Sequence, residues 1–256
     1  MYKTVLLDTI QAAGSVLLEG MKQHFQVHHK DTLNNLVTEI DKRAEALILE
    51  RIRSQFPDHA VLSEEAGAMQ RDSDFRWIID PLDGTVNFAH HLPICSVSIA
   101  LEKQGEVIMG AVYNPFLNEL FFAEKGKGAF LNERPIHVSA ADNIQTAFLV
   151  TGFPYQWRDM PHDPVEVFGY FIKQGIPVRR LGSAAIDLCW VACGRFDGYW
   201  EHHIHAWDVA AGCLIVREAG GRVSDFQGRD YDLQASQLIA SNGFIHGDLL
   251  HAVQTA

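Results

Sequence analysis

The sequence predicts a protein of the α+β or α/β class, in which helices pack on β-sheets. Residues 1–145 begin with two helical patterns and continue as short β-rich runs separated by tight turns, whereas residues 146–256 alternate helical and strand patterns. No linker, repeat or low-complexity tract separates these two halves. We therefore expect one domain over residues 1–256, built from two halves that meet near residue 145.

The composition is that of an ordinary globular protein. Hydrophobic residues make up 47% and charged residues 21% of the 256 positions, which is enough apolar material for a large core. No apolar run approaches the roughly 20 residues needed to span a bilayer, and the first residues lack the pattern of a secretion signal. The four cysteines are too few and too scattered for a disulfide framework. We therefore expect a cytoplasmic protein with no membrane partner.

The formal net charge of −11 restricts the classes of partner. Nucleic acids and anionic membranes are bound by basic surfaces, so we expect no direct nucleic-acid binding. An anionic substrate also fits such a protein poorly, unless bound divalent cations invert the field inside an acidic site. If the protein handles phosphate, the charge predicts that it needs a metal.

The N-terminal segment predicts two helices joined by a polar connection. Apolar residues recur at near-helical spacing over residues 4–25 and again over residues 41–56. We interpret the polar residues 28–31 as a mobile loop, either plainly solvated or able to cover a site, and residues 36–38 as a short strand. Asp41 stands three positions after Thr38, as in a helix cap, and an acid in a first helical turn is also explained by the helix dipole.

Acidic residues follow the ends of two predicted strands. Residues 59–63 favour a strand that runs into the acidic turn beginning at Glu64. Residues 77–79 favour a buried strand that stops at Asp80, because Pro81 cannot continue a central ladder. Neighbouring strands that end together would bring these carboxylates together. A solvated acidic turn is the alternative for Glu64.

The segment 77–88 carries the clearest chemical signal and reads Trp-Ile-Ile-Asp-Pro-Leu-Asp-Gly-Thr-Val-Asn-Phe. Asp80 and Asp83 stand three residues apart, so a tight turn can direct both carboxylates, and the Leu82 carbonyl between them, into one cavity. Such a hard, all-oxygen ligand set suits Mg²⁺. The structural alternative is that Asp-Pro-x-Asp-Gly is ordinary turn chemistry.

Gly84 and Thr85 come directly after these two acids. Backbone N–H groups at a turn or at the start of a helix are a common binding site for phosphate. A buried strand that delivers two acids and then Gly-Thr is more than a turn requires, so this segment favours a functional site.

The rest of the first half predicts an antiparallel meander. Turn sequences at Gln104-Gly105 and Asn114-Pro115 separate its first three strands. The Gly-Lys-Gly sequence near residue 126 is not a P-loop, because the spacing and the Lys-Ser/Thr ending are missing. The expected strands are residues 94–102, 107–113, 119–123, 129–131 and 135–138.

The second half predicts alternating helices and strands. Strands are expected over residues 146–151, 178–180, 196–200, 223–224 and 238–241. Helices are expected over residues 163–174, from about residue 182, from residue 206 to 216, and from about residue 243 to 253.

Candidate site residues also occur in the second half. The small residues Gly182, Ser183 and Ala184 open a helix and allow a ligand to approach the backbone, although simple helix packing explains them equally well. Glu201 is an acid at a strand end. Asp208 lies in a first helical turn, where it is either a ligand or a partner of the helix dipole.

The histidines at positions 202, 203 and 205 raise the possibility of a zinc site. The nearby acids suit harder cations, and no Cys/His framework accompanies them. Cys189 and Cys193 lie four apart on a predicted helix, and we interpret them as buried thiols. The histidines have no assigned role at this point.

Two separated motifs resemble the inositol monophosphatase family of metal-dependent, lithium-sensitive phosphatases. The first combines Glu64-Glu65 with the segment 77–88. The second is Trp-Asp-Val-Ala-Ala-Gly over residues 207–212, followed by Glu-Ala-Gly-Gly over residues 218–221. The resemblance spans nearly the whole chain, and it implies an αβαβα layered sandwich that assembles as a homodimer.

The resemblance also implies a role for each matching residue. The metal ligands, for two or three Mg²⁺ ions, would be Glu64, Asp80, the Leu82 carbonyl, Asp83 and Asp208. Asp41, Glu64 and Thr85 would act in catalysis, with Asp41 and Thr85 orienting and activating the attacking water. Lys30 matches a lysine on the family's mobile loop. The substrate would be bound by Gly84, Thr85, Gly182, Ser183, Ala184, Glu201 and Asp208.

The implied activity is Mg²⁺-dependent hydrolysis of myo-inositol monophosphate and related small phosphate esters by a metal-activated water. Fructose bisphosphate, histidinol phosphate and nucleotide bisphosphates are alternative substrates. Histidinol-phosphate relatives more often carry an arginine where Val86 stands here, which disfavours that substrate. A different class of function is a regulatory or scaffold protein that binds transcription machinery, as some bacterial relatives are thought to do.

Overall fold

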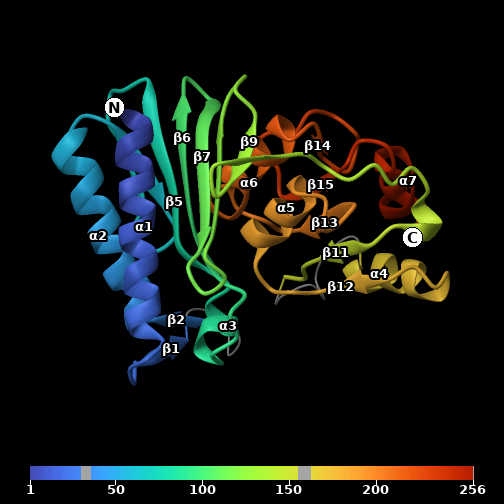
Figure 1. The fold of residues 1–256 in the computed structure, drawn as a ribbon, viewed down its shortest axis with the longest axis horizontal. Helices are drawn as coiled ribbons and strands as arrows, with labels where there is room; N and C mark the ends of the chain where they lie inside the picture. Colours follow the sequence, from blue (N-terminus) through green and yellow to red (C-terminus); the bar gives the residue numbers. More distant parts are fainter. Residues whose placement is uncertain (30–35, 155–162, 256) are drawn as a thin grey trace.

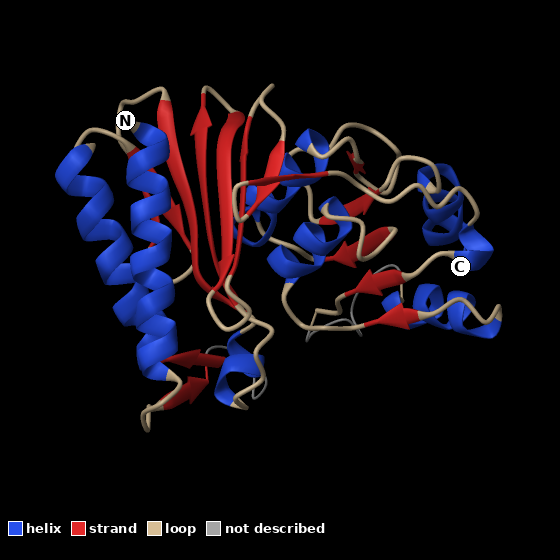
Figure 2. Ribbon diagram, viewed as in Figure 1, coloured by secondary structure: helices blue, strands red, loops and turns tan. Residues whose placement is uncertain are grey.

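The structure, a computed structural model, describes residues 1–29, 36–154 and 163–255. Its elements stack in five layers in the order helix, sheet, helix, sheet, helix, which confirms the predicted αβαβα sandwich (Figures 1 and 2). Each helical layer is a pair: α1 (Tyr2–Gly20) with α2 (Glu39–Gln55), α5 (Ala184–Ala192) with α6 (Ala206–Glu218), and α4 (Pro164–Lys173) with α7 (His246–Thr255).

The larger sheet has the strand order β10-β9-β8-β7-β6-β5-β3-β4 in the described part of the chain. β3 pairs with β5 in parallel, and the other neighbours are antiparallel, so the predicted meander is confirmed. β4 is a strand that the sequence analysis missed. The strands are β3 (Ala60–Ser63), β4 (Gly67–Met69), β5 (Phe75–Asp83), β6 (Ser96–Lys103), β7 (Glu106–Asn114), β8 (Glu119–Glu124), β9 (Ala129–Leu131) and β10 (Arg134–Ile136).

β5 continues past Pro81, so the prediction that this strand stops at Asp80 is wrong. Asp80 pairs with Ser98 of β6 and Asp83 pairs with Ser96, and the register shifts between these two pairs. β5 therefore carries one extra residue in a bulge that contains Pro81. An irregular stretch does not need the N–H group that proline lacks, which explains why the strand tolerates it.

α2 begins at the cap that the sequence indicated. The Thr38 hydroxyl oxygen accepts a hydrogen bond from Asp41 N at 3.4 Å, and the Asp41 carboxylate accepts one from Thr38 N at 2.8 Å. The two bonds form a capping box, which satisfies backbone donors at the start of the helix. The cap also fixes the direction of the Asp41 side chain.

Two short strands lie in the described part of the connection between α1 and α2. β1 (Val27–His29) pairs antiparallel with β2 (Leu36–Thr38). The predicted loop is therefore wrong at positions 28 and 29, because pairing with β2 supplies backbone partners that the polar sequence did not reveal. The remainder of that loop, including Lys30, lies outside the described residues.

The smaller sheet has the strand order β12-β11-β13-β15-β14 in the described residues. β11 is parallel to β12 and β13, and β15 is antiparallel to β13 and β14. Glu201 is the last residue but one of β13, paired with Leu238, so it lies at a strand end as predicted. The elements are a 3₁₀ turn (Ile144–Thr146), β11 (Leu149–Thr151), β12 (Val178–Arg179), β13 (Gly198–His202), β14 (Arg222–Ser224) and β15 (Gln237–Ser241).

Three hydrophobic cores, formed by the described residues, fill the spaces between the five layers. One lies between the α1–α2 pair and the larger sheet, and includes Trp77. The second surrounds α5 and α6 between the two sheets, and the third, which includes Trp200, lies between the smaller sheet and the α4–α7 pair. Adjacent residues of β5 therefore contribute to different cores, with Ile78 on the α6 side and Ile79 on the α2 side.

α6 approaches β7 very closely. A Cβ atom on Gly110 would lie 2.8 Å from the Cα atom of Ala211, a distance that real side chains do not show. Only glycine at position 110 allows this approach, because the opposing atom belongs to the backbone. The contact fixes α6, and with it Asp208, over the larger sheet.

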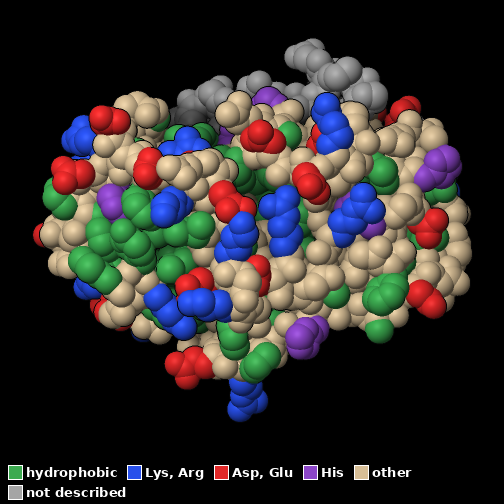
Figure 3. Space-filling view, turned by 90° about the horizontal axis from the view of Figure 1, so that it is seen from above, with side chains coloured by type: hydrophobic (Ala, Val, Ile, Leu, Met, Phe, Trp, Pro, Cys, Tyr) green, Lys and Arg blue, Asp and Glu red, His purple; other side chains and the backbone are tan. Residues whose placement is uncertain are grey.

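The surface seen from above carries basic and acidic side chains close to one another (Figure 3). A hydrophobic area lies over the end of the molecule that holds α1 and α2. Aromatic rings also pack together beside the N-terminus of α1, where the His59 ring stacks between Phe56 at 4.8 Å and Phe75 at 4.9 Å. None of the helices in the described ranges has the length and apolar character to cross a membrane.

Candidate active site

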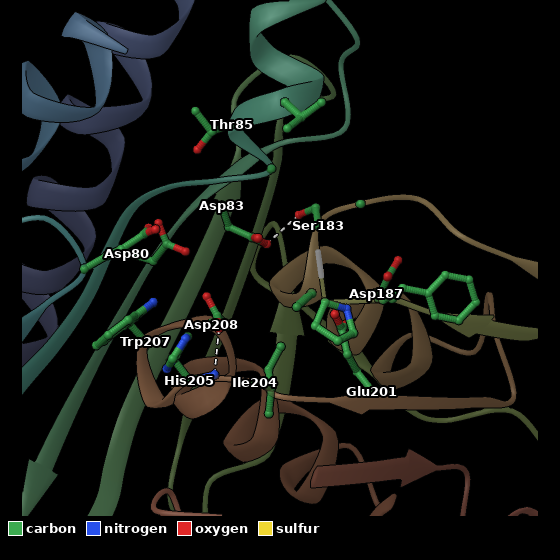
Figure 4. A pocket seen from close by; sticks show the side chains of 18 of the residues that line it. Asp80, Asp83, Thr85, Ser183, Asp187, Glu201, Ile204, His205, Trp207 and Asp208 are labelled. Carbon is green, nitrogen blue, oxygen red and sulfur yellow. Dashed lines mark hydrogen bonds between the residues drawn. The ribbon is translucent and has the colours of Figure 1, made fainter. Parts of the chain in front are cut away.

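A cavity of about 400 Å³ opens where the end of β5 and α3 (Thr85–Ala89) face the starts of α5 and α6. It brings together nearly all of the predicted site residues. Asp80 and Asp187 lie on opposite sides of the cavity, with Asp83 and Asp208 between them (Figure 4). The predicted residues that line it are Glu64, Asp80, Leu82, Asp83, Gly84, Thr85, Gly182, Ser183, Ala184, Glu201 and Asp208.

The acids of the first half meet because β3 and β5 are parallel neighbours, as the sequence analysis expected. Glu64 follows β3 directly, and its backbone N–H donates to the Ile79 carbonyl of β5 at 3.2 Å. Asp80 Oδ1 accepts a hydrogen bond from Leu82 N at 2.9 Å, which holds the bulge of β5 in shape. The strand pair thus places Glu64 next to the two acids of β5.

Asp83 joins the two sides of the cavity. Its Oδ2 atom accepts hydrogen bonds from Ser183 Oγ at 2.6 Å and from Ala185 N at 2.8 Å. These donors lie at the start of α5, far away in the sequence. Ser183, predicted as a substrate contact, therefore has a structural contact with a predicted metal ligand as well.

Asp208 enters the cavity from the first turn of α6. Its Oδ2 atom accepts a hydrogen bond from His205 N at 2.8 Å, so the carboxylate caps the helix. Asp208 thus has a structural role at the start of α6, and the same residue also lines the cavity. One carboxylate oxygen is enough for the cap, which leaves the other for a ligand.

Asp41 lies behind the cavity wall and reaches the cavity through Thr85. The Thr85 hydroxyl oxygen lies 3.1 Å from Asp41 Oδ1 and 3.0 Å from the Leu82 carbonyl oxygen. A hydroxyl has a single proton, so it donates to one of these acceptors at a time. Asp41 and Thr85 therefore form a connected pair, as their predicted shared role requires.

The carboxylates of the cavity are buried close together, which disfavours their charged forms. Burial raises the pKa of Asp80 and Asp208 well above the usual range, and repulsion from Glu64 adds to the shift. Burial also raises the pKa of Asp83 to about 6, although the hydrogen bond from Ser183 opposes the shift. Such an arrangement favours a bound cation, which would stabilise the charged forms.

The donor chemistry of this cluster fits Mg²⁺. Four carboxylates and one carbonyl supply only oxygen atoms, the ligands that this ion prefers. Within the described ranges, however, no group of three or more His, Cys, Asp or Glu side chains has the arrangement needed to hold a metal ion. Asp80, Asp83 and Asp208 each accept protein hydrogen bonds with one oxygen, so ligation would use the second oxygen of each and requires the side chains to move closer together. The metal ligand set stays a prediction.

The phosphate-binding prediction concerns the start of α3. Gly84 has φ = +85°, and a Cβ atom there would lie 2.9 Å from the Ile94 carbonyl oxygen, so glycine is required. Asn87 Nδ2 donates to the carbonyl oxygens of Ile94 and Leu181, each at 2.7 Å. These bonds hold α3 against the segment that leads into α5.

The far end of the cavity contains Glu201. Tyr199 donates a hydrogen bond from its hydroxyl to Glu201 Oε2 at 2.5 Å. Burial raises the pKa of Glu201 to about 7, against the effect of that bond. A Cβ atom on Gly152 would collide with the Glu201 carboxylate, so the glycine makes room for this acid. Glu201 is therefore held rigidly at the cavity wall.

The histidine-rich segment forms part of the cavity rim. His203, His205 and Trp207 line the cavity, and the rings of His205 and Trp207 stack with their centroids 4.7 Å apart. His203 has φ = +58°, a left-handed conformation that is uncommon for a residue with a side chain. The structure assigns no metal cluster to these rings within the described residues.

Sequence reasoning missed two residues of this region. Glu45 Oε1 accepts hydrogen bonds from Ser63 Oγ at 2.5 Å and Ala66 N at 2.9 Å. These two donors lie on either side of Glu64 in the sequence, so Glu45 holds the turn that carries Glu64. Asp187 lines the cavity next to Glu201. In both cases the available signal was an acid on the apolar face of a helix, where an unpaired charge is rare.

Comparison with known proteins agrees with this geometry. The model of the inositol monophosphatase family matches residues 2–256. An inositol-1-monophosphatase from Synechocystis is 47% identical over 250 residues, covering 97% of this chain and 87% of that protein. A protein from Pasteurella multocida named Nus factor SuhB is 44% identical over 254 residues, covering 98% of this chain and 94% of that protein.

Solved structures show the same fold. The inositol monophosphatase from Anabaena (Nostoc) superposes with a TM-score of 0.89 at 40% identity, covering 99% of this chain and 95% of that one. The extragenic suppressor protein SuhB from Bartonella henselae superposes with a TM-score of 0.94 at 37% identity, covering 100% and 99%. With the family model matching almost every residue, the chain belongs to the inositol monophosphatase family.

Proposed function

We propose that this protein is a Mg²⁺-dependent phosphomonoesterase that hydrolyses myo-inositol monophosphate and similar small phosphate esters to an alcohol and inorganic phosphate. The observation that carries the proposal is the cavity that gathers Glu64, which follows β3, with acids from β5, β13 and α6 beside the start of α3. Family membership supports a phosphatase of this type. The substrate follows from the likeness to relatives named inositol-1-monophosphatase.

In this proposal the metal-binding residues are Glu64, Asp80, Asp83, Asp208 and the Leu82 carbonyl. Bound Mg²⁺ would supply a Lewis acid that neutralises phosphate charge and lowers the pKa of a water molecule. Residues at the start of α3 orient the phosphate, with the Gly84 and Thr85 amides as donors. Two or three ions are expected.

The attacking water is oriented by the Thr85 hydroxyl and the Asp41 carboxylate. Asp41 is fully buried and lies 3.1 Å from the Thr85 hydroxyl oxygen, and burial raises its pKa to about 6. A carboxylate with a pKa near neutrality is suited to accept a proton as the water attacks. The water oxygen bonds to phosphorus as its proton passes towards Asp41, the ester P–O bond breaks, and the departing alkoxide takes a proton from a second water molecule to become the alcohol.

The alcohol portion would lie against Gly182, Ser183, Ala184 and Glu201, on the α5 and β13 side of the cavity. Glu201 and the backbone at the start of α5 can accept and donate hydrogen bonds to hydroxyl groups. The proposal also includes a homodimer, as the family resemblance implies, and a cytoplasmic location, as the composition led us to expect. Lithium inhibition is part of the same expectation.

Phosphate release from a panel of esters tests the proposal. The panel contains inositol 1-phosphate, glycerol 2-phosphate, fructose 1,6-bisphosphate, histidinol phosphate and adenosine 3′,5′-bisphosphate, each with and without Mg²⁺ and lithium. We expect Mg²⁺-dependent, lithium-inhibited release that favours inositol 1-phosphate. Absence of release from every ester would overturn the proposal.

A second candidate function is docking on transcription machinery, with the phosphatase site secondary. The support is the presence of relatives named Nus factor SuhB at 44% and 41% identity. Activity and binding assays on the purified protein distinguish the two candidate functions. A protein that is inactive on the whole panel but binds purified transcription complexes would favour docking, whereas turnover by the protein alone favours the enzyme.

A further inference from the structure

Asp187 is a buried acid in the cavity wall whose hydrogen bonding is incomplete. It lies in the first turns of α5, is 1% exposed, and lines the cavity. Its Oδ1 atom has no hydrogen-bond partner among the described residues. Proteins rarely leave a buried carboxyl oxygen unpaired, because the group loses its hydration without compensation. The missing partner can come from whatever occupies the cavity.

The surroundings of Asp187 determine what that partner can be. Asp187 and Glu201 lie at the same end of the cavity, away from Asp80 (Figure 4). Burial and then repulsion from Glu201 raise the pKa of Asp187 well above its usual range, while Arg180 on the cavity rim opposes the shift. Two carboxyl groups in a confined space hydrogen-bond hydroxyls, and their charged forms repel a second phosphate.

We propose that Asp187 is a specificity-determining residue, whose carboxyl group hydrogen-bonds a hydroxyl of the substrate's alcohol portion and, with Glu201, excludes a second phosphate. The proposal rests on the phosphatase function proposed above and names its substrate class, which is phosphate monoesters of neutral polyols. Asp187 is not one of the predicted metal ligands, so its role is separate from metal binding.

Ratios of kcat/KM within each variant test this role, because they do not depend on the fraction of active protein. Asp187→Ala should lower the ratio of inositol 1-phosphate to phenyl phosphate, which lacks hydroxyls, by about tenfold, as expected for one lost hydrogen bond to a carboxyl group. Asp187→Lys should raise the ratio of fructose 1,6-bisphosphate to inositol 1-phosphate. If both ratios stay within twofold of wild type, the proposal is wrong. If the wild type releases no phosphate at all, the proposed function has failed instead.

Melting temperature separates this role from a structural one. Asp187→Asn should leave the melting temperature unchanged or higher, because it removes a buried carboxyl without a complete set of partners. Asp197→Asn is the matched control, since this buried carboxylate accepts from Ser139 Oγ at 2.5 Å and Phe148 N at 2.7 Å outside the cavity. We expect this control to lower the melting temperature and to leave both ratios unchanged. A lower melting temperature for Asp187→Asn with unchanged ratios would assign Asp187 a structural role.

Discussion

At the scale of single residues, the site acids have two tasks each. Asp83 holds the start of α5 through Ser183 and Ala185, and Asp208 caps α6, while both line the cavity. A carboxylate has two oxygens with about four acceptor positions, so one oxygen can hold the protein while the other faces a ligand. The structural and functional explanations weighed for these residues are therefore compatible.

Asp83→Asn should reduce phosphate release by at least about a hundredfold, the upper part of the range for disturbed metal sites. The asparagine oxygen must remain with Ser183 and Ala185, so the NH₂ group would face the cavity, where it cannot bind a cation. The melting temperature should not fall, because one of several mutually repelling acids becomes neutral. Near-native activity of the variant would refute the assignment of Asp83 as a ligand.

Local sequence patterns predicted those residues whose roles depend on their neighbours in the chain. The Thr38–Asp41 cap and the Asp80–Asp83 spacing are of this kind. Asp187 and Glu45 could not be placed in this way, because their partners come from other elements. For these two, only an acid within an apolar helical face was visible, and such a pattern does not specify what the acid contacts.

At the scale of elements, α2 positions two parts of the site. Asp41 and Glu45 lie one turn apart on its buried face. The first contacts Thr85 after β5, and the second holds both sides of the turn after β3. One rigid helix therefore sets the relative position of two strand ends, where all the predicted metal ligands except Asp208 lie.

Glu45→Ala should weaken Mg²⁺ binding by about tenfold to a hundredfold, as removal of a group that orients a metal ligand typically does. The affinity can be measured by calorimetric titration, and independently by the rise in melting temperature on adding Mg²⁺. Glu102→Ala is the matched control: Glu102 is 7% exposed against 8% for Glu45, and it pairs with Arg76 at 2.6 Å.

Glu102 lies outside the cavity, so its substitution should lower the melting temperature without changing the Mg²⁺ affinity. Equal effects of both substitutions on affinity would show that Glu45 acts only through general stability. A wild-type protein that binds no Mg²⁺ would refute the metal proposal itself.

The differences between predicted and observed elements have physical causes. The sequence rule that proline ends a central strand failed at Pro81, because a bulge removes the need for its N–H group. The polar residues at 28 and 29 form a strand because β2 pairs with them. Tertiary pairing overrides local preference in both cases.

At the scale of the whole molecule, the alternation of strands and helices predicted the class of fold, while the order of the five layers came from the family resemblance. Periodicity does not reveal which faces pack together. Close approaches such as that of Gly110 to Ala211 fix the layers, and a glycine inside a strand signals such a contact without naming its partner.

The stability of the whole molecule should depend on His246 below neutral pH. This ring is fully buried between Ser224 Oγ at 2.9 Å and Ser241 Oγ at 2.8 Å, and burial lowers its pKa to about 4 from the usual 6.5. The unfolded chain therefore takes up a proton at a higher pH than the folded protein does. Its contribution to stability is complete above pH 6.5 and is lost progressively as the pH falls towards 4.

Urea unfolding at a series of pH values measures this effect. Between pH 6.5 and 4 the wild type should lose more free energy of unfolding than His246→Gln, which has no titrating ring at this position. Carboxylates elsewhere titrate in both proteins, so the difference between the two curves isolates the histidine. Parallel curves would contradict the prediction.

The division of the cavity between distant parts of the sequence has a consequence for synthesis. A chain emerging from the ribosome exposes Asp80 and Asp83 long before α6 and Asp208 have been made. At cellular rates of translation the interval is on the order of ten seconds. The nascent protein therefore cannot possess the complete cavity until almost all of its length has emerged, and any activity of this site must begin late in synthesis.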